Sequence, residues 1–163
     1  MATLTAVNPT VSKGDHMETV KKLILNGQSW SAGQLLFADA NGLLKACASN
    51  ADAGTGGIKY YALTAQTDPG DSTTYAEVAV ITPSTIFEGH ELDGVVADAN
   101  VGESYAIDVT ANVCTVDVGD TTNVAVVITE IASDYERIKN AAADVKGRCR
   151  FRVLPVALNA VGA

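Results

Sequence analysis

The stretch that decides the fold is residues 34–48, QLLFADANGLLKACA, in which two apolar runs flank a short polar turn. Asn41 and Gly42 lie inside that turn, and the pair Asn-Gly readily adopts the positive φ angles that tight hairpin turns require. The pattern therefore predicts a β-hairpin with strands at 34–38 and 43–48. A hairpin of this kind near the start of the chain favours an antiparallel, all-β fold.

Similar short runs recur along the rest of the chain, separated by Gly, Pro, Asn and Asp. Further strands are predicted at 18–25, 59–67, 75–82, 84–87, 104–109, 113–118, 123–132 and 147–154. Roughly nine short strands with turn signals about every 8–12 residues are typical of a β-sandwich or a β-barrel. We expect residues 88–100, which are polar and punctuated by glycine, to form a long loop with a central strand. No βαβ alternation indicates a parallel sheet.

A chain of 163 residues suits one domain. Residues 1–17 are rich in Thr and contain Pro9 and Gly14, and we expect them to form an extended N-terminal arm. The β-rich domain is predicted to span residues 18–158, followed by a tail at 159–163. Ser133 and Glu136 have capping-box spacing, which indicates one short helix near 134–144.

Charge is distributed unevenly along a chain whose formal net charge is −8. Residues 23–135 contain fifteen acidic side chains and only two basic ones, Lys45 and Lys59. This balance argues against nucleic acid as the main partner, because phosphate binding requires clustered Lys and Arg. It also argues against an anionic membrane surface. Neither a signal peptide nor a span-length apolar run is present, so we expect synthesis in a cytoplasm and no membrane contact.

The sequence offers few candidates for catalysis or metal binding. Of the two histidines, His16 lies in the predicted arm and His90 stands beside acidic residues. His90 and its neighbours either ligate a metal or act as a base, or they form a solvated acidic loop, which is the interpretation we favour because no second histidine is nearby. Residues 98–109 lack EF-hand spacing, although a weak calcium site of another kind stays open. We predict no catalytic residue, no cofactor and no metal site.

Three cysteines, an odd number without a CxxC motif, lie in apolar or alternating runs at positions 47, 114 and 149. We expect reduced thiols in or near the core. The segment 147–154, GRCRFRVL, alternates strictly, so Arg148, Arg150 and Arg152 share one face of a strand. Three interpretations of this arginine stripe stay open. The stripe pairs with the protein's own carboxylates, such as Asp117 or Glu130, or meets an acidic surface on a partner. Contact with nucleic acid is the third and the least favoured.

Several of these segments together resemble bacteriophage capsid decoration proteins, also called head-stabilisation or cement proteins. The resemblance is carried by the hairpin QLLF…NGLLKA, by YALTA at 61–65 and EVAVIT at 77–82, by VGESYAI at 101–107 and by GRCRFRVLP at 147–155. It implies a small β-rich module, often a homotrimer, that binds the major capsid protein on the outside of an expanded icosahedral shell and bridges neighbouring capsomers. It implies a virion protein made in the bacterial cytoplasm, with no enzymatic activity.

In that family an extended N-terminal arm commonly reaches the shell. The matching candidates for partner binding in this chain are Pro9, Lys13, Lys21 and Lys22, together with the stripe Arg148, Arg150 and Arg152. A competing hypothesis is a carbohydrate- or receptor-binding β-sandwich of a phage fibre or tail, in which Trp30, Tyr60, Tyr61 or Tyr75 would stack on a sugar. An enzyme on a jelly-roll scaffold is disfavoured, because cupin-like sites need two or three converging histidines.

Overall fold

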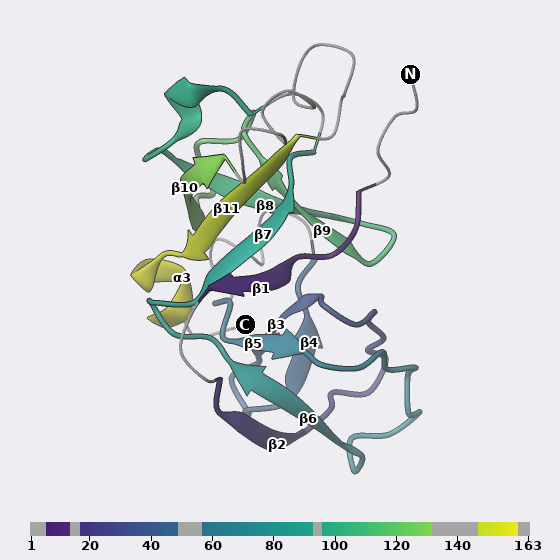
Figure 1. Ribbon diagram of the computed structural model, residues 1–163. Helices are drawn as coiled ribbons and strands as arrows, with labels where there is room; N and C mark the ends of the chain where they lie inside the picture. Colours follow the sequence, from purple (N-terminus) through teal and green to yellow (C-terminus); the bar gives the residue numbers. More distant parts are fainter. Residues whose placement is uncertain (1–5, 14–16, 49–56, 93–95, 132–146, 160–163) are drawn as a thin grey trace.

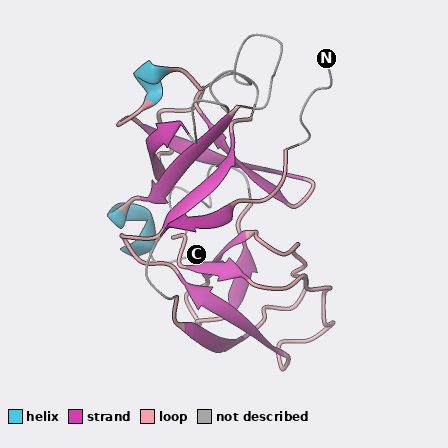
Figure 2. Ribbon diagram, in the orientation of Figure 1, coloured by secondary structure: helices cyan, strands magenta, loops and turns pink. Residues whose placement is uncertain are grey.

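The computed structural model describes residues 6–13, 17–48, 57–92, 96–131 and 147–159, and within them the chain is mostly β-strand (Figures 1 and 2). Two antiparallel sheets are formed, of six and five strands, so the predicted all-β class is confirmed. The six-stranded sheet has the order β1 (Thr10–Lys13), β7 (Ile86–His90), β11 (Arg148–Val153), β10 (Val126–Ile131), β8 (Ser104–Thr110) and β9 (Val113–Asp117). The five-stranded sheet has the order β2 (Thr19–Leu23), β6 (Tyr75–Val80), β5 (Tyr60–Ala62), β3 (Leu35–Ala38) and β4 (Leu44–Ala46).

The hairpin predicted from residues 34–48 is present as β3 and β4, with Leu36 opposite Ala46 and Ala38 opposite Leu44. Asp39 organises the turn, because its Oδ1 accepts hydrogen bonds from the backbone N–H groups of residues 41 and 43, both at 2.9 Å. Gly42 takes φ +81°, a conformation that glycine adopts without steric cost. The strands predicted at 104–109 and 113–118 are present as β8 and β9, which pair antiparallel across the turn at residues 110–113.

Each sheet curls until its distant strands meet. In the five-stranded sheet, Ile24 at the end of β2 forms a parallel bridge to Leu44 of β4. In the six-stranded sheet, Glu91 just after β7 forms a parallel bridge to Val116 of β9, and the N–H of Leu92 donates to the Val116 carbonyl at 2.9 Å. Both bridges cover strand edges that an open sheet would expose to solvent. Strand β1 lies outside the second ring and pairs with β7.

Two hydrophobic clusters form the core, and β3 contributes to both. Leu35 and Phe37 point into the larger cluster, which includes Phe87 of β7 and Phe151 of β11 and so joins the two sheets. Leu36 points the opposite way, into a smaller cluster with Trp30 and others inside the curled five-stranded sheet. The three cysteines are buried and none is disulfide-bonded, as predicted, and all belong to the larger cluster.

Several predicted boundaries differ from the structure. Eleven strands are described where roughly nine were expected. β5 ends at Ala62, whereas its strand was predicted to reach residue 67. A short 3-10 helix, η1 (Asp98–Asn100), precedes β8, and a short helix, α3 (Pro155–Asn159), follows β11, where no helix was predicted. The helix predicted near 134–144 lies outside the described residues.

Candidate interaction surfaces

Residues 6–13 are held against the body of the protein. Residues 10–13 form β1, in which Thr10 lies opposite Glu88 and Val11 opposite Phe87. Figure 1 shows β1 on the side of the six-stranded sheet that faces the five-stranded sheet. Residues 10–13 of the predicted extended arm are therefore paired into the six-stranded sheet. The physical reason is that β7 offers a strand edge, and pairing satisfies backbone groups that an isolated arm would leave to water.

Asn8 fastens this segment to both halves of the molecule. Its Nδ2 donates to the carbonyl of Ala32, before β3, at 3.2 Å and to the carbonyl of Asn112, in the β8–β9 turn, at 2.9 Å. Its Oδ1 accepts from the backbone N–H of Cys114, in β9, at 2.8 Å. The side-chain amide of Asn8 has two donor hydrogens and two acceptor lone pairs, and all but one acceptor lone pair are used. We call this arrangement the Asn8 clamp.

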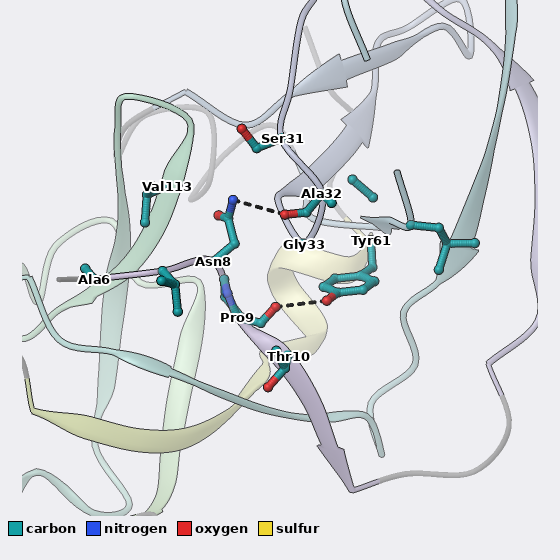
Figure 3. Close-up of a pocket in the computed structure, with 12 residues that line it drawn as sticks. Ala6, Asn8, Pro9, Thr10, Ser31, Ala32, Gly33, Tyr61 and Val113 are labelled. Carbon is teal, nitrogen blue, oxygen red and sulfur yellow. Dashed lines mark hydrogen bonds between the residues drawn. The ribbon is translucent and has the colours of Figure 1, made fainter. Parts of the chain in front are cut away.

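Pro9, a predicted partner-binding residue, is buried next to the clamp. Its carbonyl accepts a hydrogen bond from the hydroxyl of Tyr61 at 2.9 Å, as Figure 3 shows. The Tyr61 ring lies 5.6 Å from the ring of Phe87, and burial raises the pKa of the Tyr61 hydroxyl above its ordinary value. The ring of Pro9 approaches Gly89, where an added Cβ would lie 3.0 Å from Phe151. Pro9 therefore packs within its own chain.

A groove of about 580 Å³ opens beside the clamp (Figure 3). Four chain segments line it, and none of the lining side chains is charged: Ala6, Val7, Asn8, Pro9, Thr10, Ser31, Ala32, Gly33, Tyr61, Ala62, Leu63 and Val113. Two apolar side chains on its rim are unusually exposed, Val7 at 52% and Leu63 at 44%. The chain carries a net charge of −8, yet no charged side chain lines this groove. A surface of this kind favours apolar contacts.

The backbone at the rim adds hydrogen-bonding capacity. Within the described ranges, neither Val7 nor Leu63 forms a backbone hydrogen bond to another residue. An extended segment lying in the groove can therefore use main-chain N–H and C=O groups as well as apolar side chains. Signals for this site are weak in the sequence, because its four segments are far apart in the chain. Asn-Pro at 8–9, a turn-favouring pair, is the one local signal.

The arginines of the stripe differ in the ion pairs that they form. Nη1 of Arg150 lies 2.8 Å from Oε1 of Glu130, and its Nε lies 3.4 Å from Oε2 of Glu88. Arg148 shares Glu88, at 3.6 Å. The hydrogen bond to Glu130 is the main cause of a raised pKa for the Arg150 guanidinium. Pairing with the protein's own carboxylates was one of the three interpretations, and it is confirmed for Arg150 and Glu130. Asp117, the other carboxylate named, accepts from the N–H of Gly119.

Arg152 differs from the other two arginines. It is exposed, lies opposite Val127 in the strand register, and makes no ion pair with a described carboxylate. Of the stripe, this side chain has its charge available to a partner.

The predicted lysines lie on β1 and β2. Lys21 is exposed on β2 opposite Glu77, and Nζ of Lys22 lies 5.4 Å from the centre of the Tyr60 ring. Lys13 is in β1 opposite Ile86. Lys21 and Lys22 belong to the five-stranded sheet, whereas the arginine stripe and Lys13 belong to the six-stranded sheet. The structure therefore does not gather the predicted partner-binding residues into one patch.

The favoured interpretation of His90 in a solvated acidic loop is wrong. His90 and Glu91 are 4% and 2% exposed, because β7 continues through His90 and pairs with Arg148 of β11. Among the residues that the structure describes, no three His, Cys, Asp or Glu side chains gather closely enough to hold a metal ion. His16 lies outside those residues. Burial raises the pKa of the Cys114 and Cys149 thiols to about 12, so both are poor nucleophiles at neutral pH.

The aromatic side chains proposed for sugar stacking are mostly occupied. Trp30 is buried, Tyr60 lies beneath Lys22, and Tyr61 packs against Phe87. Tyr75 is 63% exposed and is the one of the four that presents an open ring. A single open ring among the four aromatic side chains gives little support to a carbohydrate site.

Comparison of the chain with protein-family models, with curated proteins and with solved structures found no match. In the described part of the chain, neither helix has the length and apolar character needed to cross a membrane. The case for a function therefore rests on the surfaces described above and on the resemblance in sequence.

Proposed function

We propose that this protein is a structural component of a bacteriophage virion that binds the outer surface of the icosahedral capsid as a homotrimer and stabilises it by bridging neighbouring capsomers. The observation that carries the proposal is the N-terminal segment. It is fixed in an extended form by the Asn8 clamp and by β1, and it leaves Val7 and Val11 52% and 39% exposed. Apolar side chains held outward on a rigid support are typical of a protein-contact surface.

The physics of a symmetric shell suits this kind of surface. Each contact can be weak, because many copies bind simultaneously and the effective concentration of each further contact is high. Rigid presentation lowers the entropy lost on binding, and so a small apolar patch contributes more than it would on a mobile arm. Arg152 lies on the same sheet as Val11 and supplies a positive charge that can pair with an acidic group on the shell.

The direct test is co-sedimentation with empty, expanded heads assembled from the shell protein encoded in the same genome. We expect saturable binding at a fixed ratio to the shell protein, and heads that withstand higher temperature when the protein is bound. Val11→Lys should weaken binding at least tenfold, because it places a charge in an apolar contact. Val156→Lys is the matched control, since Val156 is 60% exposed and belongs to α3, not to β1.

Circular dichroism and a melting curve must first show that both variants fold. A wild-type protein that stays in the supernatant at every concentration tested, with no change in head stability, contradicts the proposed function. Equal loss of binding by the two valine variants would show that the contact is not at β1.

A further inference from the structure

We propose that the uncharged groove beside the Asn8 clamp binds residues 1–5 of a second copy of this chain, so that copies associate head to tail. The inference identifies the contact that holds the proposed homotrimer together, and in that respect it rests on the proposed function. Its test requires no capsid, because the groove and the segment that enters it belong to the same polypeptide.

The chemistry of the groove fits this occupant. Residues 1–5, MATLT, contain no charged side chain and supply two larger apolar ones, Met1 and Leu4. The groove is equally free of charge, and Val7 and Leu63 provide exposed apolar contacts at its rim. The chain as a whole is strongly acidic. The carboxylates of an acidic segment would lose their hydration in this groove, and no cationic side chain lines it to pair with them. An uncharged segment avoids that loss.

Geometry favours a neighbouring chain over the same chain. Ala6 itself lines the groove, so residues 1–5 begin at the rim of their own copy. Returning into that groove would require a tight turn within five residues and would leave few of them for contact. Five extended residues instead span at most about 17 Å, which is sufficient to reach an adjoining subunit.

The backbone supplies the rest of the recognition. Val7 and Leu63 form no backbone hydrogen bonds within the described ranges, so an incoming extended segment can pair with one or both. The two partners in this contact are different surfaces, a segment and a groove. Such a heterologous contact generates a closed ring when the rotation between copies allows it, and a trimer is one such ring.

The test compares the molar mass of three variants in solution with that of the full-length protein, by light scattering during gel filtration over a concentration series. The first variant lacks residues 2–5. The second is Leu63→Glu, which places a charge at the rim of the groove at a site too exposed to disturb the core. The third is Val156→Glu, a control at an apolar site that is more exposed than Leu63, 60% against 44%, and does not line the groove.

We expect the wild type and the control to form the same oligomer. The deletion and Leu63→Glu should each raise the dissociation constant at least tenfold and yield monomer. Mixing the deletion variant with Leu63→Glu provides a sharper test. The deletion variant retains the groove and Leu63→Glu retains the segment, so an equimolar mixture should form a 1:1 complex although neither variant associates alone.

Three results would overturn the inference. One is a wild type that is monomeric at all concentrations, and another is a deletion variant that keeps the wild-type mass. The third is failure of the mixed variants to form a complex. Dissociation on removing residues 160–163, with the first deletion still oligomeric, would assign the groove to the other end of the chain. Head binding by a monomer refutes this inference and the trimeric state but leaves capsid binding standing, whereas self-association without head binding refutes capsid binding and leaves this inference standing.

Discussion

Replacing Asn8 by Ala should destabilise the protein by about 3 kcal/mol, which is large for a side chain that is only half-buried. The change removes both donor contacts of Nδ2 and the acceptor contact of Oδ1. The N–H of Cys114 is part-buried, and leaving such a donor unsatisfied costs about 1–3 kcal/mol. The carbonyls of Ala32 and Asn112 belong to exposed residues that water can reach, so each should contribute only about 0.5 kcal/mol.

The measurement is urea unfolding followed by the fluorescence of Trp30, which is buried in the smaller cluster. In a domain of this size the expected loss corresponds to a fall in melting temperature of roughly 6–12 °C. Asn41→Ala is the matched control, because Asn41 is exposed and its side chain has no hydrogen bond within the described ranges; its effect should stay within about 0.5 kcal/mol. Equal, small effects at the two positions would refute the reasoning that Asn8 fastens the sheets together.

Asn8→Asp refines the same test. The carboxylate can still accept from the N–H of Cys114, but its second oxygen faces the carbonyl oxygens of Ala32 and Asn112, to which Asn8 donates. The folded state therefore raises the pKa of the new carboxyl group, since the protonated form can donate there. A raised pKa means that the folded state binds more protons, so this variant should gain stability relative to wild type as pH falls. No such gain should occur in Asn8→Ala.

The other predictions concern backbone conformation, the ion pairs and a buried thiol. Gly33→Ala should lower the free energy of unfolding by about 2–4 kcal/mol, because Gly33 has φ +82° and an added Cβ would lie 3.0–3.1 Å from the N-terminal segment. Gly42→Ala should lower it by only about 1–2 kcal/mol, because Gly42 has φ +81° but open space around it. Urea unfolding measures both effects. Arg150→Met should lower stability by about 1 kcal/mol in low salt and by less in high salt, whereas Arg152→Met should have almost no effect. The pKa of about 12 predicts that Cys114 resists thiol labelling at pH 8 until the protein is unfolded, and rapid labelling of the native protein would contradict its burial.

The parts of the fold that could be predicted from sequence are those with a local cause. The turn containing Asn41 and Gly42 determines its own hairpin, because both the positive φ and the Asp39 contacts lie within five residues. β11 was predictable for a similar reason, since alternation of Arg with apolar residues matches a strand with one buried face. Pairing of Arg150 with Glu130 follows from the adjacency of β10 and β11, which sequence could suggest but not decide.

The parts that could not be predicted depend on contacts between distant segments. TVSK at residues 10–13 has no pattern that distinguishes a strand from an arm, and its pairing with β7 joins positions more than 70 residues apart. His90 was placed in a loop because glycine and acidic residues surround it. Gly89 in fact lies within β7, where the absence of a side chain leaves room for Phe151 and Pro9. The groove is assembled from four separate segments, so none of them carries the whole pattern.

The Asn8 clamp and the groove are adjacent, yet they make separable claims about the protein. The clamp contacts buried or backbone groups of the same chain, so its loss should lower stability whether or not a partner exists. Val7 and Leu63 contact little within the chain, so changing them should leave stability almost intact and alter association alone. If the groove only filled space between the two sheets, polar substitutions at its rim would have no effect on either property. A loss of association without a loss of stability would therefore distinguish a binding surface from an imperfection in packing.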